Sequence, residues 1–497
     1  MSFLTIYNNE SAGVALIPVM PYGEFRKANL DLMTDHPERH CLLYFGYHEG
    51  GHIKLVCCIA DDRNHNILVS SALAEQDSAL ESFSSVNFNF EKFERVLNES
   101  FGLNYSDHPW LKPARYAENR FDKKLSMYDY PFFRIDSEEL HEVGVGPVHA
   151  GIIEPGHFRF VCKGEQILHL EIQLGYQHRG IENLFLEKKK AIQRIVLSES
   201  IAGDSVAGHA SSYAFLAEAL SGVKQQREVL FARTLAQELE RIAVHTGDLS
   251  ALCTDIAYQL GSAVFGRLRT PVINFMQEWC GNRLGKGLIR PGYNAYAFNN
   301  ELADRLNSVL DNFEPDFIEM NREVSKLPSA LSRFERTGAL SYEQLLSIGT
   351  VGMAARMNAL ERDIRVSHPY GLYPELDHKP VIKHHGDVYS RVQIRKEETL
   401  QSIAYVRKLI SSLPDPAGEA SLNPKPDSFA ISMNEGWRGE TCHAAITDSD
   451  GEIKVYRVKD PSFHNWLALA LAVRYNEISD FPVCNKSFNL SYCGHDL

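Results

Sequence analysis

The sequence lacks the features that mark several common classes of protein. No apolar run approaches the roughly eighteen residues of a membrane span, and the start, MSFLTIYNNESAG, has neither the basic region nor the apolar core of a signal peptide. No GxGxxG motif opens a helix after a strand, so we expect no directly bound NAD. Lysine and arginine are spread along a chain of net charge −13, so we expect no nucleic-acid partner.

Paired cysteines are also missing. The nine cysteines include no CxxC pair, which argues against a zinc site or an iron-sulfur cluster held by this chain. Scattered cysteines in a large protein are most often buried small apolar residues. We expect this of all nine, which are Cys41, Cys57, Cys58, Cys162, Cys253, Cys280, Cys442, Cys484 and Cys493.

The residues that are present indicate a folded protein of more than one unit. A length of 497 residues exceeds one ordinary core, and 44% apolar with 23% charged residues is typical of globular chains. Three strand-like runs, CLLYFGY, HIKLVCCIA and NHNILVSSAL, precede a helical stretch at 90–101 whose apolar residues share one face. We therefore expect a small α/β domain over residues 1–125, with a charged, aromatic tether at 114–133.

Residues 126–497 predict a mainly helical domain with small antiparallel hairpins, so the fold class is α+β. Strands at 157–162 and 165–172 turn at Gly164, and strands at 442–449 and 452–458 turn at Gly451. We expect one small sheet to bring both hairpins to one end of the helices. The apolar spacing over 234–256 predicts a long packed helix, as does the pattern at 397–410. The Pro-rich segment 412–426 predicts a surface loop.

Five stretches carry a resemblance to a known family. In chain order they are GPVHAGIIEPGHFRF at 146–160, GYQHRGIE at 175–182, GLIRPG at 287–292, GDVYSRVQIRKEETLQSI at 386–403 and VKDPSFHNW at 458–466. Over roughly residues 140–497 the chain resembles the large-subunit family shared by group 4 membrane-bound nickel-iron hydrogenases, of the formate hydrogenlyase type, and the 49 kDa subunit of complex I. The stretch FERVLNESFGLNYSDHPWLKPARY at 93–116 resembles the 30 kDa subunit of complex I.

The resemblance also shows where a nickel-iron site would be and what it has lost. The hydrogenases hold the two metals with four cysteines, two in a C-G-x-C stretch and two in a C-terminal D-P-C-x-x-C motif. Ala202 and Ser205 stand at the first pair of positions, and Ser462 and Asn465 stand at the second. Because soft thiolates are what nickel and iron require there, we expect no nickel-iron centre. The tail after residue 466 shows no recognisable processing site, so we expect it to be retained.

Quinone is the cofactor that the complex I side of the resemblance suggests. In that family a histidine in the first hairpin loop and a tyrosine at the start of the long helix hold the quinone headgroup. His149 lies in the hairpin loop here, but the matching spacing falls on Glu154 and Pro155, and Gly203 stands at the tyrosine position. Neither quinone ligand is therefore in its expected place.

The candidate site residues follow from the same resemblance. Glu199, His149 and Asp204 are the candidate catalytic or proton-carrying residues, and His149, His209, Arg290 and His464 are the candidate ligand-binding residues of the former metal cavity. An unpaired Asp204 would be costly to bury, so we suggest Arg290 as its partner. Structural alternatives remain for two residues, because His149 could cap its loop and Glu199 could lie on a helix surface.

Two further patterns favour structure over chemistry. Arg179 and Glu182 are expected to pair and to fix a helix start. His384 with His385, and His36 with His40, lack partners at metal-ligand spacing, so we expect both groups in solvated loops.

The resemblance implies a peripheral subunit on the cytoplasmic side of the cell membrane, within a complex I-like, hydrogenase-related oxidoreductase complex. Its expected partners are a 20 kDa-like iron-sulfur subunit and membrane proton- or ion-channel subunits; iron-sulfur clusters and any NAD would belong to partner subunits. The expected role is coupling of electron transfer to proton or ion movement. The alternatives are a non-catalytic scaffold with a filled ancestral site and, less favoured, a hydrogenase with substitute ligands.

Overall fold

The N-terminal part of the chain forms a mainly antiparallel sheet covered by helices. The computed structural model describes residues 2–149 and 153–497. Strands β4 (Arg39–Glu49), β5 (His52–Asp61) and β6 (Asn66–Ala74) pair in sequence order, and β1 (Leu4–Ile6) and β3 (Val19–Met20) both pair with β6. β5 is buried along nearly its whole length because α1 (Tyr22–Met33) and α2 (Glu91–Phe101) pack beside the sheet. The predicted helix at 90–101 is confirmed as α2, which ends at Gly102 with a φ of 74°.

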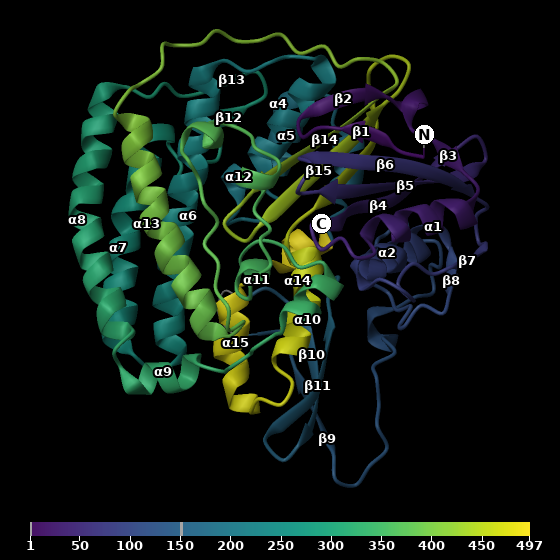
Figure 1. The fold of residues 1–497 in the computed structure, drawn as a ribbon, viewed down its shortest axis with the longest axis horizontal. Coiled ribbons are helices and arrows are strands. Elements are labelled where there is room, and N and C mark those ends of the chain that lie inside the picture. Colours follow the sequence, from purple (N-terminus) through teal and green to yellow (C-terminus); the bar gives the residue numbers. More distant parts are fainter. Residues whose placement is uncertain (1, 150–152) are drawn as a thin grey trace.

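The beginning of the chain also completes a sheet built from its end. Strand β2 (Glu10–Gly13) pairs antiparallel with β14 (Ser428–Glu435), which continues through β15 (Glu440–Thr447) to β16 (Ile453–Lys459). The first residues and the last quarter of the chain therefore share one hydrogen-bonded layer (Figure 1).

The two predicted hairpins form, but in two separate sheets. β10 (His157–Lys163) and β11 (Gln166–Gln173) pair with β9 (His141–Val145) in a three-stranded sheet that projects from the body (Figure 1). β15 and β16 belong to the four-stranded sheet instead. The expectation of a single sheet was wrong, because β9 and β14 each supply a local partner for one hairpin. Both predicted turn glycines adopt positive φ, 57° at Gly164 and 82° at Gly451.

Long helices pack side by side at the opposite side of the molecule from the N-terminal sheet (Figure 1). They are α6 (Arg227–Asp255), α7 (Gln259–Cys280), α8 (Asn300–Val324) and α13 (Val388–Ile410). The apolar stripe predicted for 234–256 is buried in α6 at Leu235, Leu239, Ile242, Leu249 and Leu252. The pattern at 397–410 lies within α13, and residues 412–426 carry neither helix nor strand, as predicted.

Shorter elements connect the bundle to the sheets. α5 (Val206–Ser221) packs on β14 and β15, and α14 (Ser462–Ala472) packs on β11. The other short elements are α3 (Ile181–Glu187), α4 (Ala191–Ser198), β12 (Ile289–Arg290), β13 (Tyr293–Asn294), α9 (Pro328–Phe334), α10 (Tyr342–Ile348), α11 (Met353–Arg356), α12 (Ile364–Ser367), α15 (Phe481–Phe488), α16 (Tyr492–Asp496), β7 (Ala79–Glu81) and β8 (Asn104–Ser106).

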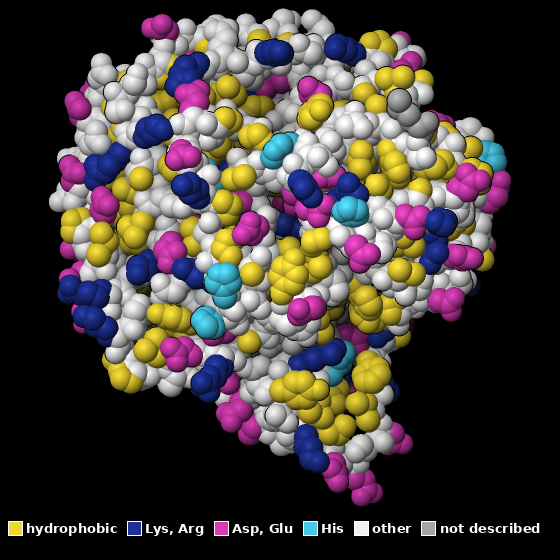
Figure 2. All heavy atoms as spheres, viewed as in Figure 1, with side chains coloured by type: hydrophobic (Ala, Val, Ile, Leu, Met, Phe, Trp, Pro, Cys, Tyr) yellow, Lys and Arg dark blue, Asp and Glu magenta, His cyan; other side chains and the backbone are white. Residues whose placement is uncertain are grey.

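The surface and the cysteines agree with the composition. All nine cysteines are buried, as predicted, and none of them forms a disulfide. On the face in Figure 2, basic and acidic side chains are interspersed rather than gathered into a field of one sign. Within residues 2–149 and 153–497, no helix combines the length and the apolar character needed to cross a bilayer.

Candidate functional site: the buried region between α5 and α14

The four positions that would carry thiolates lie at the starts of two helices. Ala202 and Ser205 precede α5, whereas Ser462 and Asn465 open α14, and all four side chains are buried. A hydrogen bond joins the two helix starts, because His209 Nε2 of α5 lies 3.0 Å from Asp460 Oδ2, two residues before α14. The fold thus brings together the two segments that the resemblance placed in one cavity.

An arginine from the turn between β14 and β15 enters this region. Arg438 donates from Nη1 to Asp204 Oδ1 at 2.6 Å and from Nη2 to Asp204 Oδ2 at 2.7 Å, a two-pronged pair. Its Nη1 also lies 3.1 Å from Ser205 Oγ, and its Nε donates to the carbonyl of Asn489 at 2.6 Å. The partner of Asp204 is therefore Arg438, and the suggested pairing with Arg290 was wrong.

The residues present do not fit a nickel-iron centre. None of the four positions offers sulfur. The polar groups at two of them already have partners, because Ser462 Oγ accepts from Ser491 N at 2.8 Å, and the Asn465 amide accepts from Val351 N and donates to the Val351 carbonyl. A guanidinium beside Ser205 also adds positive charge where a metal cation would need negative ligands. Among the described residues, no group of three or more His, Cys, Asp or Glu is arranged to hold a metal ion.

A chain of buried hydrogen bonds runs from Asp460 into the sheet. His209 Nδ1 lies 3.0 Å from His443 Nε2, and His443 Nδ1 lies 2.6 Å from Tyr456 Oη. Burial raises the pKa of Asp460, but the hydrogen bond from His209 and the charge of Arg438 are among the effects that outweigh it, so the net pKa is lowered. With Asp460 ionised and one proton on each imidazole, the series of contacts is satisfied when Nε2 of each histidine and the Tyr456 hydroxyl carry the protons.

The chain is polarised by this assignment. Burial holds the pKa of His443 well below its usual range and that of Tyr456 well above its usual range, so both groups are neutral at neutral pH. Each member donates toward Asp460, the one anion of the series.

A second carboxylate beside this region escaped sequence reasoning. Glu240 of α6 accepts a hydrogen bond from Ala207 N at 2.7 Å, at the first turn of α5. Burial raises its pKa to about 8, with the nearby charge of Asp204 adding to the effect against the Ala207 hydrogen bond. Glu240 lies among the apolar residues of the long helix α6, and its sequence surroundings do not mark it as a site residue. Only its position beside α5 in the folded chain does so. Arg438 had a local signal, the charged turn EGWRGE between two strands.

Glu199 and Arg290 are brought together, away from the Asp204 pair. Glu199 is buried at the C-terminal cap of α4, where Oε1 accepts from Gly287 N at 2.8 Å and from Arg290 Nη1 at 3.1 Å. The structural alternative of an exposed helix carboxylate was therefore wrong. No hydrogen bond among the described residues connects Glu199 to Asp204 or Arg438.

The two remaining candidate histidines face other surroundings. His149 Nε2 lies 2.9 Å from the carbonyl of Gly156, so it closes the loop between β9 and β10, which includes residues outside the described part of the chain. His464 is buried with its ring 5.4 Å from the Phe93 ring of α2, and burial lowers its pKa far below the usual range. Neither side chain bonds to Arg438, Asp204 or Asp460.

Two structural expectations also need correction. Arg179 donates to the carbonyls of Ser200 and Ile201, whereas Glu182 accepts from Val458 N at 3.0 Å, so the two side chains do not pair. His40 is buried, with Nε2 2.8 Å from Glu440 Oε2, because the N-terminal sheet packs against β15 and β16. His36, His384 and His385 are exposed, as expected.

Comparison with known proteins supports the resemblance to the 49 Kd subunit family. Residues 261–426 match the family described as the 49 Kd subunit of respiratory-chain NADH dehydrogenase. The predicted resemblance is confirmed. The chain is 28% identical over 354 residues to the carbon monoxide-induced hydrogenase of Rhodospirillum rubrum, covering 70% of this chain and 97% of that protein. It is 27% identical over 387 residues to hydrogenase-4 component G of Escherichia coli, covering 78% and 67%.

A solved structure supports the fold. A chain of the membrane-bound sulfane sulfur reductase, an archaeal respiratory membrane complex, superposes with a TM-score of 0.68 at 19% identity, covering 73% of this chain and all of that one. The homologues are thus subunits of complex I-like and hydrogenase-related membrane complexes. They include a fused protein of the NADH-quinone oxidoreductase of Phocaeicola vulgatus, 27% identical and covering 65% of this chain and 63% of that protein.

Proposed function

We propose that this chain is a peripheral subunit, on the cytoplasmic side, of a complex I-like membrane oxidoreductase complex. In this role it couples electron transfer, with quinone as the candidate acceptor, to proton or ion movement without a nickel-iron centre. Electrons reach it from an iron-sulfur subunit, and membrane subunits move the ion. Relatives in membrane-bound hydrogenases and NADH-quinone oxidoreductases support the assembly.

One observation carries the coupling role. The region between α5 and α14 contains groups that hold or pass protons, namely the Asp204–Arg438 pair, Glu240, and the chain from Asp460 through His209 and His443 to Tyr456. A carboxylate with a pKa of about 8 changes its charge near neutral pH, and a charge change there alters the field on Asp204 and Arg438. Proton uptake in this region is therefore the event that we propose to be linked to electron transfer.

Exposed apolar side chains support a partner surface. Five of them flank β9 in sequence, namely Tyr128, Phe133, Ile135, Val148 and Ile153. Figure 2 shows apolar side chains gathered over the projecting end of the molecule, where Figure 1 places β9, β10 and β11. Patches of this kind mark protein interfaces, so we assign this end to contact with a partner subunit.

The test uses the intact complex purified from membranes. Asp460→Asn and Glu240→Gln should each lower quinone reduction by about 10²-fold, the size of a lost proton-transfer group, while the subunits still co-purify. Glu278→Gln, an exposed glutamate of α7, is the matched control and should leave turnover unchanged. Stoichiometric nickel in this chain, or full turnover in both variants, would refute the proposal.

A non-catalytic scaffold is the second candidate. It is favoured by the extent to which the region is filled, since Asn465 is tied to Val351 and Arg438 is held at all three nitrogens. Under this candidate the same two variants would impair assembly of the complex. Electron transfer per assembled complex would then equal that of the unaltered protein, which separates the two functions.

A further inference from the structure

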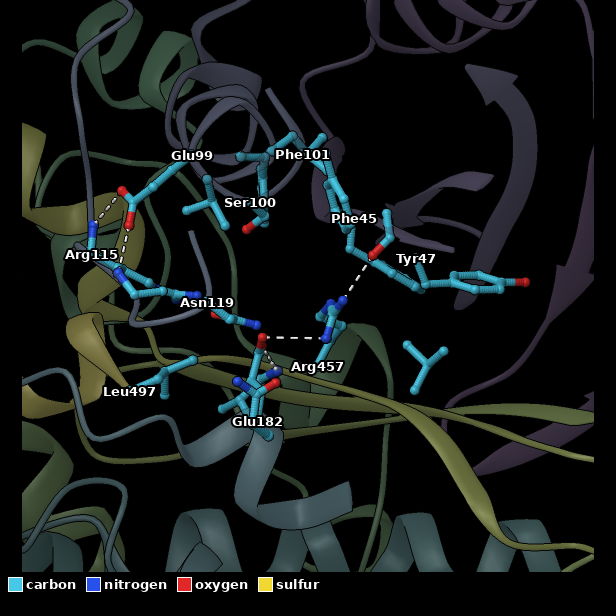
Figure 3. A pocket seen from close by; sticks show the side chains of 18 of the residues that line it. Phe45, Tyr47, Glu99, Ser100, Phe101, Arg115, Asn119, Glu182, Arg457 and Leu497 are labelled. Carbon is cyan, nitrogen blue, oxygen red and sulfur yellow. Dashed lines mark hydrogen bonds and ion pairs between the residues drawn. The ribbon is translucent and has the colours of Figure 1, made fainter. Parts of the chain in front are cut away.

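A hollow lies where the N-terminal sheet and α2 meet the C-terminal part of the chain. It has a volume of about 420 Å³ and is lined from β4, α2, the segment after residue 114, α3, β16 and the last residue, Leu497. Figure 3 shows its charged side chains in two groups, with Arg115 on the side of Glu99 and Arg457 together with Glu182. Ligand pockets commonly measure about 300 to 1,000 Å³, so the hollow can hold a small molecule.

Arg115 is the distinctive group of this pocket. The residue is only 8% exposed, and its Nε donates to the carbonyl of His495 at 3.0 Å. Neither terminal nitrogen of the guanidinium donates a hydrogen bond to any residue that the structure describes. Burial lowers the pKa of Arg115, against the opposing charges of Glu182, Asp496 and Glu99. Neither terminal nitrogen is sealed from solvent, so both stay available to an acceptor that enters the pocket.

The carboxylates that line the pocket are committed elsewhere. Glu99 accepts three backbone N–H groups, from Ala114, Arg115 and Ala117, at 2.7 to 3.0 Å. Glu182 accepts from Val458 N at 3.0 Å and lies 3.4 Å from Arg457 Nη1. Arg457 is also satisfied, because it donates to the carbonyls of Tyr456 and Gly46. Of the two lining arginines, Arg115 is the one whose terminal nitrogens both lack a hydrogen bond to a described residue.

The remaining walls are aromatic and apolar. The guanidinium carbon of Arg115 lies 5.0 Å from the centre of the Phe463 ring, and Phe45, Phe93 and Phe101 line the same space. The exposed amide of Asn119 stands at the rim beside the solvent. The pocket thus combines an aromatic wall with polar and charged groups such as Arg115 and Asn119, and small-molecule sites likewise join apolar walls to polar groups that orient the ligand.

We propose that this pocket binds a small carboxylate with a flat apolar body. The two terminal nitrogens of Arg115 match the two oxygens of a carboxylate, and the phenylalanine rings enclose the apolar part. The site is separate from the region between α5 and α14, where Arg438 is already paired, and it does not depend on the proposed coupling role.

Titration calorimetry on the full chain tests the proposal, with benzoate as the probe and benzamide as its neutral counterpart. Benzoate should bind at least about tenfold more tightly than benzamide, and Arg115→Gln should weaken benzoate at least about tenfold. Arg115→Lys keeps the charge but loses the fork, so it should give an intermediate loss. Arg305→Gln, an exposed arginine of α8, is the control and should bind as the unaltered chain does.

Folding is checked by thermal melting of each variant. If Arg115→Gln melts early, Arg115→Lys with benzoate against benzamide still decides the question. Equal affinities for benzoate and benzamide, unaltered benzoate binding in Arg115→Gln, or no heat of benzoate binding up to about 10 mM would each overturn the proposal. Binding of inorganic phosphate in place of benzoate would overturn the assignment to a carboxylate with an apolar body.

Discussion

Two buried arginines near the start of α14 have opposite surroundings. Both terminal nitrogens of Arg438 donate to the Asp204 carboxylate, and its Nε donates to the carbonyl of Asn489. This arginine lies where the resemblance to hydrogenases places the metal-binding thiolates. Arg115 stacks on Phe463 and leaves both terminal nitrogens free toward an open pocket. The comparison indicates that the first cation completes the internal structure, whereas the second is prepared for an acceptor that comes from outside the chain.

The largest expected effect is the loss of the internal pair. Arg438→Met should lower the free energy of unfolding by about 2 to 3 kcal/mol, because it removes the donors that bind Asp204, Ser205 and Asn489 and leaves the buried Asp460 without a nearby cation. The Asp204 side chain is 40% exposed, so water takes up part of the loss there. Chemical denaturation of the purified chain measures this change.

A double variant checks the physical reason. In Asp204→Asn with Arg438→Met the uncompensated Asp204 charge is gone, so part of the lost stability should return. If both variants unfold at the same denaturant concentration as the unaltered chain, Arg438 does not have the role assigned to it here.

Local patterns predicted much of the fold. The apolar spacing of α6, the amphipathic α2 and the two glycine turns depend on residues close in sequence, and the structure confirms them. The pairing of β2 with β14 depends on contacts across more than 400 residues, and the hairpins separate because neighbouring strands β9 and β14, which the sequence patterns did not single out, pair with them. No local pattern encodes the choice among such partners.

The candidate site likewise has a part that the sequence predicted and a part that only the folded structure shows. The resemblance placed Ala202, Ser205, Ser462 and Asn465 in one region, and the folded chain brings their segments together. The partner of Asp204 was missed because Arg438 lies 234 residues away and several arginines were equally available. His209 was identified, but its bonds to Asp460 and His443 required the three-dimensional arrangement of α5 against the sheet.

The charge of Asp496 determines how far the positive charge of Arg115 is balanced within the chain. Burial raises the pKa of Asp496 to about 7, against hydrogen bonds from Gln177 and Gly175 and the charge of Arg115. The folded protein then binds a proton that the unfolded chain releases near pH 4, so this group's contribution to stability is lost as pH rises from about 4 to about 7. Near neutral pH, Asp496 is therefore only partly ionised and only partly balances Arg115.

Asp496→Asn should remove that pH dependence. Relative to the unaltered chain, the variant should gain about 2 kcal/mol in unfolding free energy between pH 5 and pH 7, measured by denaturation at intervals of half a pH unit. Parallel pH profiles for the two proteins would show that Asp496 titrates in its ordinary range. Arg115 would in that case be better compensated than the pocket geometry implies.

The smallest expected effect comes from the same substitution at the other arginine. Arg115→Met should change the free energy of unfolding by less than about 1 kcal/mol, because it removes a cation that has no carboxylate bonded to its terminal nitrogens and loses one hydrogen bond to His495. Denaturation beside Arg438→Met measures both sites under one condition. A loss at Arg115 as large as that at Arg438 would show that Arg115 is internally paired in solution, and the distinction between the two arginines would fail.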